Sequence, residues 1–205
     1  MAVLGVAGAI RERDPDLGVA MLTQIELVDR ARAGDHDAFE TLVRNAASRL
    51  YGTAKLILRD PERSEDAVQE ALMVAWRNIG ALRTSEAFHA WLYRLTVREC
   101  QRLAAKQRRH VIAEASVERS EPVQPDFSRS VDDRDRLDRE LARLPLDQRT
   151  VVVLHFYLDL PLADAATILD IPIGTAKSRL HRALEAMRSG VGHGSDRRVG
   201  EVARS

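Results

Sequence analysis

The feature that most constrains this chain is a helical repeat of apolar residues that stops and restarts at short intervals. Within residues 35–58, apolar side chains recur at steps of three and four, including Phe39, Leu42, Val43, Ala46 and Leu50. This spacing puts them on one face of an α-helix, whereas a half-buried strand requires strict alternation. Asp35 and Asp60-Pro61 stand where two of these segments begin, as helix-capping residues do. The pattern predicts an all-α protein.

The predicted helices fall into two groups. Residues 23–109 contain four amphipathic segments, the first capped by Thr23, which is typical of a small four-helix bundle. Residues 110–130 lose the periodicity and are predicted to be a flexible linker. Helical signals return over 131–188, whereas 1–22 is predicted to be a loose extension and 189–205 a disordered tail. We therefore expect two small helical domains joined by a flexible linker.

The composition restricts the classes of function. Lys+Arg and Asp+Glu both number 31, so the net charge is 0 and a uniformly basic surface is excluded. The single cysteine, Cys100, excludes a disulfide framework and a cysteine-based zinc cluster. No apolar run approaches the roughly 20 residues that span a bilayer, so we expect no membrane insertion and a cytoplasmic location. No nucleophile constellation, carboxylate pair or phosphate-binding loop is evident, so neither an enzyme nor a cofactor or metal site is predicted.

Neutrality overall conceals a segregation of charge. Residues 91–110 carry six basic side chains and one acidic, and residues 172–190 carry four basic and one acidic. Residues 62–80 instead carry four acidic and two basic side chains. Two basic helices in different modules are suited to two contacts with a phosphate backbone. The acidic helix would be repelled by DNA, and it favours a protein partner.

The segment 160–187 follows the plan of a helix-turn-helix. A short helix over 161–169 is followed by a turn at Asp170-Ile171-Pro172 and by a longer basic helix over 173–187. In that plan the second helix enters the major groove, and its first turns meet base edges. The side chains presented there are Thr175, Lys177, Ser178, Arg179 and Arg182. We also expect Asp147 to cap the helix that follows Pro145.

Four stretches of this sequence together resemble the extracytoplasmic-function (ECF) sigma factors of the sigma-70 family. Residues 171–183, IPIGTAKSRLHRA, resemble the family's region 4 recognition helix, and 144–149, LPLDQR, resemble the entry to that region. Residues 60–71, DPERSEDAVQEA, and 88–95, FHAWLYRL, are similar to region 2. The region 2 and region 4 matches are independent and occur in the family's order, so together they indicate the family more specifically than either match alone.

The resemblance implies a protein without catalytic residues that binds core RNA polymerase and directs it to promoter DNA. Region 4 would read the −35 element as duplex and contact the β flap, and region 2 would hold the separated strands of the −10 element. In the family one face of region 2 docks on the clamp helices of the β′ subunit; its matching positions here are Asp66, Gln69, Glu70, Met73 and Arg77. The family is commonly held inactive by an anti-sigma factor.

The −10 candidates lie on the fourth predicted helix. Arg94, Arg98 and Arg102 recur at steps of four and are predicted to hold the non-template strand or the duplex just upstream. Trp76 and Trp91 sit at core spacing and are predicted to be buried rather than to stack on bases.

The sequence departs from the family in the second module, and one other class of function remains open. Asp170 stands where a left-handed glycine is usual, Pro161 where a Ser or Thr cap is common, and Ala165 where a larger apolar residue is common. Asp tolerates the left-handed conformation better than most residues, so the turn is expected to form. The alternative function is a stand-alone dimeric DNA-binding regulator that uses only its helix-turn-helix.

Overall fold

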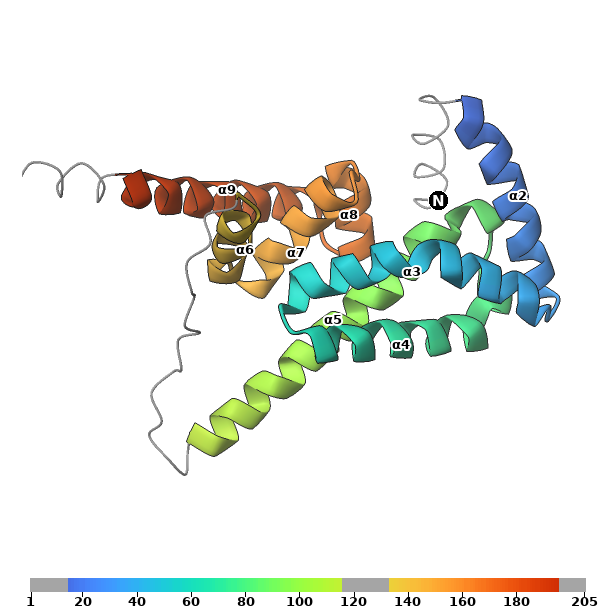
Figure 1. Cartoon of the computed structure of the whole chain (residues 1–205), viewed down its shortest axis with the longest axis horizontal. Helices are drawn as coiled ribbons and strands as arrows, with labels where there is room; N and C mark the ends of the chain where they lie inside the picture. Colours follow the sequence, from blue (N-terminus) through green and yellow to red (C-terminus); the bar gives the residue numbers. More distant parts are fainter. Residues whose placement is uncertain (1–14, 116–132, 196–205) are drawn as a thin grey trace, which may run out of the picture.

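The computed structural model describes residues 15–115 and 133–195, and within these ranges all regular elements are helical (Figure 1). The first half, residues 15–115, contains α2 (Pro15–Arg32), α3 (His36–Leu58), α4 (Pro61–Asn78), the short turns η1 (Ile79–Ala81) and η2 (Ser85–Ala87), and α5 (Phe88–Ala115). The second half, residues 133–195, contains α6 (Asp133–Arg143), α7 (Leu146–Val152), the π-helical turn η3 (Val153–Tyr157), α8 (Leu162–Leu169) and α9 (Ile173–Ser195). The all-α prediction is confirmed.

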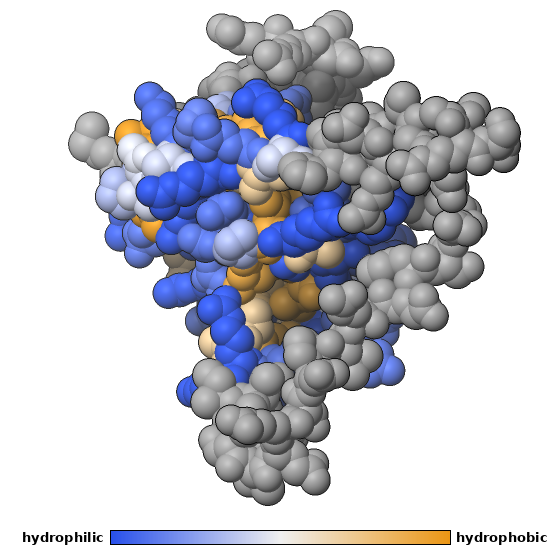
Figure 2. Space-filling model, turned by 90° about the vertical axis from the view of Figure 1, so that its left-hand side faces the viewer, coloured by the Kyte–Doolittle hydropathy of each residue, from blue (hydrophilic) through white to orange (hydrophobic). Residues whose placement is uncertain are grey.

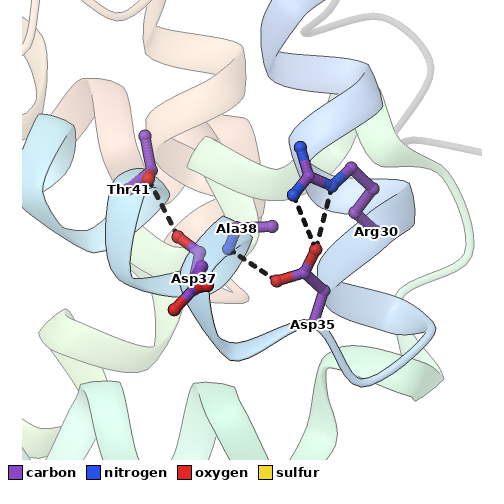
Figure 3. Close-up of polar contacts among 5 residues, drawn as sticks. All are labelled: Arg30, Asp35, Asp37, Ala38 and Thr41. Carbon is purple, nitrogen blue, oxygen red and sulfur yellow. Dashed lines mark hydrogen bonds and ion pairs between the residues drawn. The ribbon is translucent and has the colours of Figure 1, made fainter.

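Two aspartates start helices in the first half, as the sequence predicts. The Asp35 carboxylate accepts from the Ala38 backbone N–H at 3.1 Å, and Arg30 donates to its other oxygen at 2.7 and 2.9 Å (Figure 3). The Asp60 carboxylate accepts from the Arg63 N–H at 3.0 Å. Each contact satisfies a backbone donor that has no partner inside its helix. The sharp corners between α2, α3 and α4 are thereby fixed.

The first half has a deep apolar core. α3, α4 and α5 pack against one another, and α2 packs on α3. Their inward faces bury large side chains completely, including Val28, Leu50, Ile57, Phe88, Leu92 and Val97. The outer faces of α4 and α5 are therefore held rigidly in relation to each other.

The second half has a smaller core of its own. Its members are Leu141, Leu144, Val152 and Ala183. α7 and α8 begin after Pro145 and Pro161, and neither proline provides a side-chain cap. The prediction that Asp147 caps α7 is therefore wrong, because the preceding Pro145 fixes the extended backbone that a helix start requires.

The two halves pack together. α8 lies against α5, and α7 and η3 lie against α3 (Figure 1). Val153, Leu154 and Ile168 of the second half belong to the same buried cluster as Leu50 and Ile57 of the first. The two predicted helical domains therefore share a buried contact among the described residues.

Three helix ends differ from the sequence-based expectation. α2 begins at Pro15 rather than at Thr23, since proline is preorganised for the first helical turn. α5 runs to Ala115, into the expected linker, because residues 110–115 contain neither proline nor glycine to end the helix. α9 runs to Ser195, since extending a nucleated helix adds one hydrogen bond per residue. The rest of the expected extension, linker and tail lies in 1–14, 116–132 and 196–205, outside the described residues.

Exposed apolar side chains are more numerous in the second half than in the first. The large ones among the described residues are Met73 in the first half and Leu137, Phe156, Tyr157 and Ile173 in the second. Figure 2 shows the side on which α6 and the end of α9 lie, where a strip of hydrophobic residues runs between hydrophilic ones.

None of the described helices has the length and apolar character needed to cross a membrane.

Candidate functional site

The outer face of α4 carries the set of residues that the resemblance assigns to polymerase. Asp66, Gln69, Met73 and Arg77 are exposed, and Glu70 is partly buried. Glu70 and Arg77 are 3.7 Å apart at their closest charged atoms, and Arg77 Nε donates to the Met73 carbonyl at 3.1 Å. The opposite face of α4 is buried at alanines, so the helix cannot rotate to hide this set. A rigid, mixed acidic and apolar surface suits a protein partner.

The three arginines predicted to hold the −10 strands do not share one environment. Arg98 and Arg102 are exposed, and Arg102 Nε pairs with Glu99 at 2.5 Å. Arg94 instead turns toward the second half, where its Nη2 donates to the Thr167 carbonyl of α8 at 2.8 Å. Two of the three side chains therefore face solvent, and the third lies at the contact between the halves.

A groove of about 520 Å³ connects the outer faces of α4 and α5. It is lined by Val74, Leu95, Arg98, Glu99, Gln101 and Arg102. Two of these side chains are apolar and four are polar or charged, as expected of a surface that binds a partner with both kinds of group. The −10 candidates Arg98 and Arg102 thus border the helix that carries the polymerase set.

The helix-turn-helix forms as predicted, with Asp170 at the turn. Asp170 has φ 55° and ψ 46°, the left-handed conformation expected from its position. The Ile171 N–H bonds back to the Ala166 carbonyl at 3.0 Å, and the Thr175 N–H bonds to the Pro172 carbonyl at 2.9 Å. These bonds close the end of α8 and the beginning of α9, which fixes the direction in which α9 leaves the turn.

The recognition face of α9 is open to solvent at most of its predicted contacts. Lys177, Ser178 and Arg182 are exposed, and Thr175 is partly buried. Arg179 is only 28% exposed, because its Nε pairs with the Asp147 carboxylate of α7 at 3.2 Å. The side chains that the sequence predicts to contact bases and phosphates therefore lie on one helix, and one of them is held by a carboxylate.

Three residues with clear structural roles at the site were missed by the sequence reasoning. Asp147 was expected to be a cap and instead pairs with Arg179. Arg149 and Arg59 cross between the halves, where Arg149 Nη1 donates to the Ile57 carbonyl at 2.8 Å and Arg59 donates to the Asp138 carbonyl. No local pattern marks contacts between residues so distant in the chain.

The described residues contain no group of three histidine, cysteine or acidic side chains that could hold a metal ion. Cys100 is fully buried, and burial raises the pKa of its thiol to about 12. A thiol in such a state is a poor nucleophile.

Comparisons with known families match the two halves separately. The family description "Sigma-70 region 2" matches residues 42–110, and "Sigma-70, region 4" matches residues 134–187. The first covers α4, most of α3 and most of α5, and the second covers the helix-turn-helix. Each candidate face thus lies within a matched region.

Similar proteins span both halves. The chain is 31% identical over 182 residues to the RNA polymerase sigma-H factor of Pseudomonas aeruginosa, which covers 82% of this chain and 94% of that protein. It is 35% identical over 158 residues to the ECF RNA polymerase sigma factor SigM of Mycobacterium tuberculosis, with 77% and 79% covered.

Solved structures agree with the fold. The sigma factor RpoE of Bartonella quintana, solved with the anti-sigma factor NepR, matches with a TM-score of 0.61 and 28% identity over 74% of this chain and 94% of that chain. CnrH, solved with the cytosolic domain of CnrY, matches with a TM-score of 0.63 and 21% identity over 83% and 98%. The second likeness concerns the fold alone.

Proposed function

Since this chain belongs to the ECF group of the sigma-70 family of RNA polymerase sigma factors, we propose that its two halves divide promoter recognition between them. A sigma factor binds core RNA polymerase and directs it to promoter DNA, while the polymerase performs the chemistry. The first half would hold the −10 element as separated strands, and the second would read the −35 element as duplex. The observation that carries this division is the placement of an acidic face and two basic faces on three rigidly held helices.

The −35 element is assigned to the outer face of α9. Thr175, Lys177, Ser178, Arg179 and Arg182 are the contacts proposed. Lys and Arg donate to guanine O6 and N7, and Thr and Ser bond to a base or a phosphate. The exposure of Lys177, Ser178 and Arg182 supports this role.

The −10 element is assigned to α5 and its groove with α4. Arg94, Arg98 and Arg102 are the proposed contacts, through the sequence-independent attraction between guanidinium and phosphate. The exposed positions of Arg98 and Arg102 support this directly. Arg94 reaches DNA only when its bond to Thr167 is released.

Polymerase is assigned to the outer face of α4, through Asp66, Gln69, Glu70, Met73 and Arg77. This face lies opposite the buried side of α4, so a clamp helix can approach it without disturbing the core. The half-exposed Met73 offers an apolar contact at the centre of a charged surface. A contact of the second half with the β flap completes the proposed holoenzyme.

Regulation by an anti-sigma factor, absence of enzymatic activity and a cytoplasmic location are proposed with this function. The Bartonella quintana neighbour was solved bound to an anti-sigma factor, which supports an equivalent partner here. The relatives are sigma factors, which supports a binding protein rather than an enzyme. The same likeness supports a location in the compartment where RNA polymerase works. Sequence likeness in the first half disfavours the alternative of a stand-alone dimeric regulator.

The test is run-off transcription with a bacterial core polymerase and a library of promoter sequences. We expect defined transcripts that require this protein, and loss of both transcription and polymerase co-purification in the double variant Asp66→Lys with Glu70→Lys. The matched control, Glu26→Lys with Glu40→Lys, reverses two exposed charges on α2 and α3 and should transcribe normally. A stable homodimer that binds promoter DNA but not core polymerase would contradict the proposal.

A further inference from the structure

An ion pair connects two helices of the second half. α7 and α9 lie side by side, and the Asp147 carboxylate in the first turn of α7 approaches Nε of Arg179 on α9 to 3.2 Å (Figure 1). Lys177 and Arg182, the other two cations of the proposed −35 set, are exposed and form no ion pair within the described part of the chain. Arg179 therefore differs from its neighbours on the recognition face in being held.

The helix that carries Asp147 is firmly anchored. Arg149, two residues further on, donates through Nη1 to the Ile57 carbonyl at 2.8 Å and through Nη2 to the Leu144 carbonyl at 2.9 Å. Thr150, in the same short helix, is fully buried. α7 cannot shift without breaking these contacts, so the backbone of Asp147 keeps a fixed position beside α9.

Arg179 stands at the edge of the recognition face rather than at its centre. Successive residues of an α-helix are about 100° apart around its axis, so Arg179 lies about 60° from the exposed Arg182 and about 60° from the fully buried Ala176. Asp147 of α7 meets it at this edge. A long side chain that leaves α9 here can contact α7 and a DNA groove at the same time.

The arginine side chain has enough donors for both contacts. Its planar guanidinium carries five N–H groups, one on Nε and four on the two Nη atoms. The closest approach to Asp147 is made by Nε, and a guanine accepts two N–H groups at its O6 and N7 atoms. A carboxylate beside Nε and a guanine at the Nη end can therefore bind the same guanidinium.

A guanidinium that is held discriminates between base pairs better than a mobile one. A mobile arginine turns to the nearest phosphate, and phosphates carry no sequence information. An arginine that is already oriented loses less conformational entropy when it meets a correctly placed guanine. The negative charge of Asp147 also repels the phosphates near Arg179, which weakens binding to every duplex in which no guanine compensates.

We infer that Asp147 is a positioning residue for promoter recognition, which orients the Arg179 guanidinium to read one guanine of the −35 element and keeps it from neighbouring phosphates. This inference rests on the proposed function and deepens it. Arg179 makes the base contact and Asp147 acts through Arg179, whereas Lys177 and Arg182 bind DNA independently of the carboxylate. Asp147 thus lowers the affinity for duplex DNA in general and raises the preference for one base pair.

The test measures base preference as well as affinity. The full chain, with and without core polymerase, is incubated with a library of duplexes of randomised sequence, and the bound sequences are counted. We expect the wild-type protein to prefer G·C at one position by about 5- to 150-fold, the discrimination expected of one bidentate arginine. Asp147→Asn should lose most of that preference and should bind the duplexes that lack the guanine more tightly than the wild type does.

Two further variants separate positioning from overall charge and from folding. Asp138→Asn removes the same charge from α6, where the carboxylate lies 3.9 Å from Arg59, and it should leave the base preference unchanged. Asp147→Glu keeps a carboxylate on α7 and should retain more of the preference than Asp147→Asn does. Circular dichroism should show the same helical content in all three variants, because each replaces a half-exposed side chain by one of similar shape.

Variants of Arg179 identify the base pair that it reads. Arg179→Lys keeps the charge but lacks the planar fork, so it should lose the preference at the same position as Asp147→Asn. In the Arg179→Lys background, Asp147→Asn should cause no further loss of that preference. Losses at two different positions would show that the two residues act separately, and they would overturn the inference.

Other results would overturn it as well. One is an Asp147→Asn variant whose affinity for every duplex changes by the same factor, since the carboxylate would then act through overall charge or stability. Another is a wild-type preference that Arg179→Lys leaves intact, or a full chain that selects no base pair in either condition. Failure of the proposed function looks different, because the protein would then not bind core polymerase, whereas the selection with the protein alone still decides the role of Asp147.

Discussion

The two halves of this protein reach stability by different means. The first half buries large side chains such as Phe88 and Leu50 and starts two helices with capping carboxylates. The second half adds only a small core to the cluster that it shares with the first, and its α7 and α8 begin without side-chain caps. Small domains bury too little surface to be secure alone. The comparison teaches that the second half, which carries the recognition helix, gains stability from packing on the first.

The largest expected effect tests the depth of the first core. Phe88→Ala should lower the free energy of unfolding by about 3–5 kcal/mol, because it removes a fully buried ring and leaves a cavity. Urea unfolding followed by the fluorescence of Trp76 and Trp91 measures the loss. The control Phe156→Ala removes the same ring from a site 60% exposed in the second half, and it should cost less than about 0.5 kcal/mol. Equal losses of unfolding free energy in the two variants would show that the two halves do not differ in this way.

The next effect tests whether the basic helices of the two halves have separate tasks. Arg182→Ala should weaken binding to a −35 duplex by about 1–3 kcal/mol if its guanidinium reads a base. Titration at several salt concentrations separates a base contact from a phosphate contact, because losing a phosphate contact lowers the salt slope by about 1. Arg102→Ala removes an exposed cation from α5 and should leave −35 binding unchanged. A comparable loss of −35 binding in both variants would show that the basic helices of the two halves do not have separate tasks.

The contrast between Arg182 and Arg94 shows where sequence reasoning succeeds and where it fails. The α9 face could be predicted because the turn at Asp170 and Pro172 fixes the neighbouring helices locally. On α5, steps of four advance about 40° around the helix, so Arg94 and Arg102 point about 80° apart. Identical spacing thus placed one arginine in solvent and the other against α8. The contact between the halves determines which arginine is exposed and which packs against α8. That contact joins residues 73 positions apart in the chain.

Apolar periodicity has the same limit. It predicted α3 and α4, because those helices bury one face within their own half. It did not predict that Leu154 would pack with the first half, since the apolar pattern shows that a residue is buried but not which surface covers it. It also ended α5 too early, because residues 104–110 contain no large apolar side chain that would continue the pattern.

A third prediction uses a titratable group found in the first half. Burial, with a smaller contribution from Arg49, lowers the pKa of His89 from its usual 6.5. As pH falls through about 6.5, the unfolded chain gains a proton that the folded chain does not, so stability is lost by at most about 1.4 kcal/mol per pH unit. Urea midpoints between pH 8 and pH 5 should show this slope, and His89→Gln should flatten it. His181→Gln, at an exposed site on α9, should leave the slope in place.

The smallest expected effect concerns the carboxylate that holds Arg179 in the second half. The Arg179 and Asp147 side chains are 28% and 50% exposed, so solvent screens their attraction and the pair is worth only about 0.2–1 kcal/mol. Asp147→Asn should free the guanidinium for phosphate and strengthen −35 binding by about that amount. Asp138→Asn removes the same charge from α6, so the difference between the two variants isolates the local contact. In an Arg179→Ala background the gain should vanish; a gain that persists there would mean that Asp147 acts on DNA binding through overall charge rather than through Arg179.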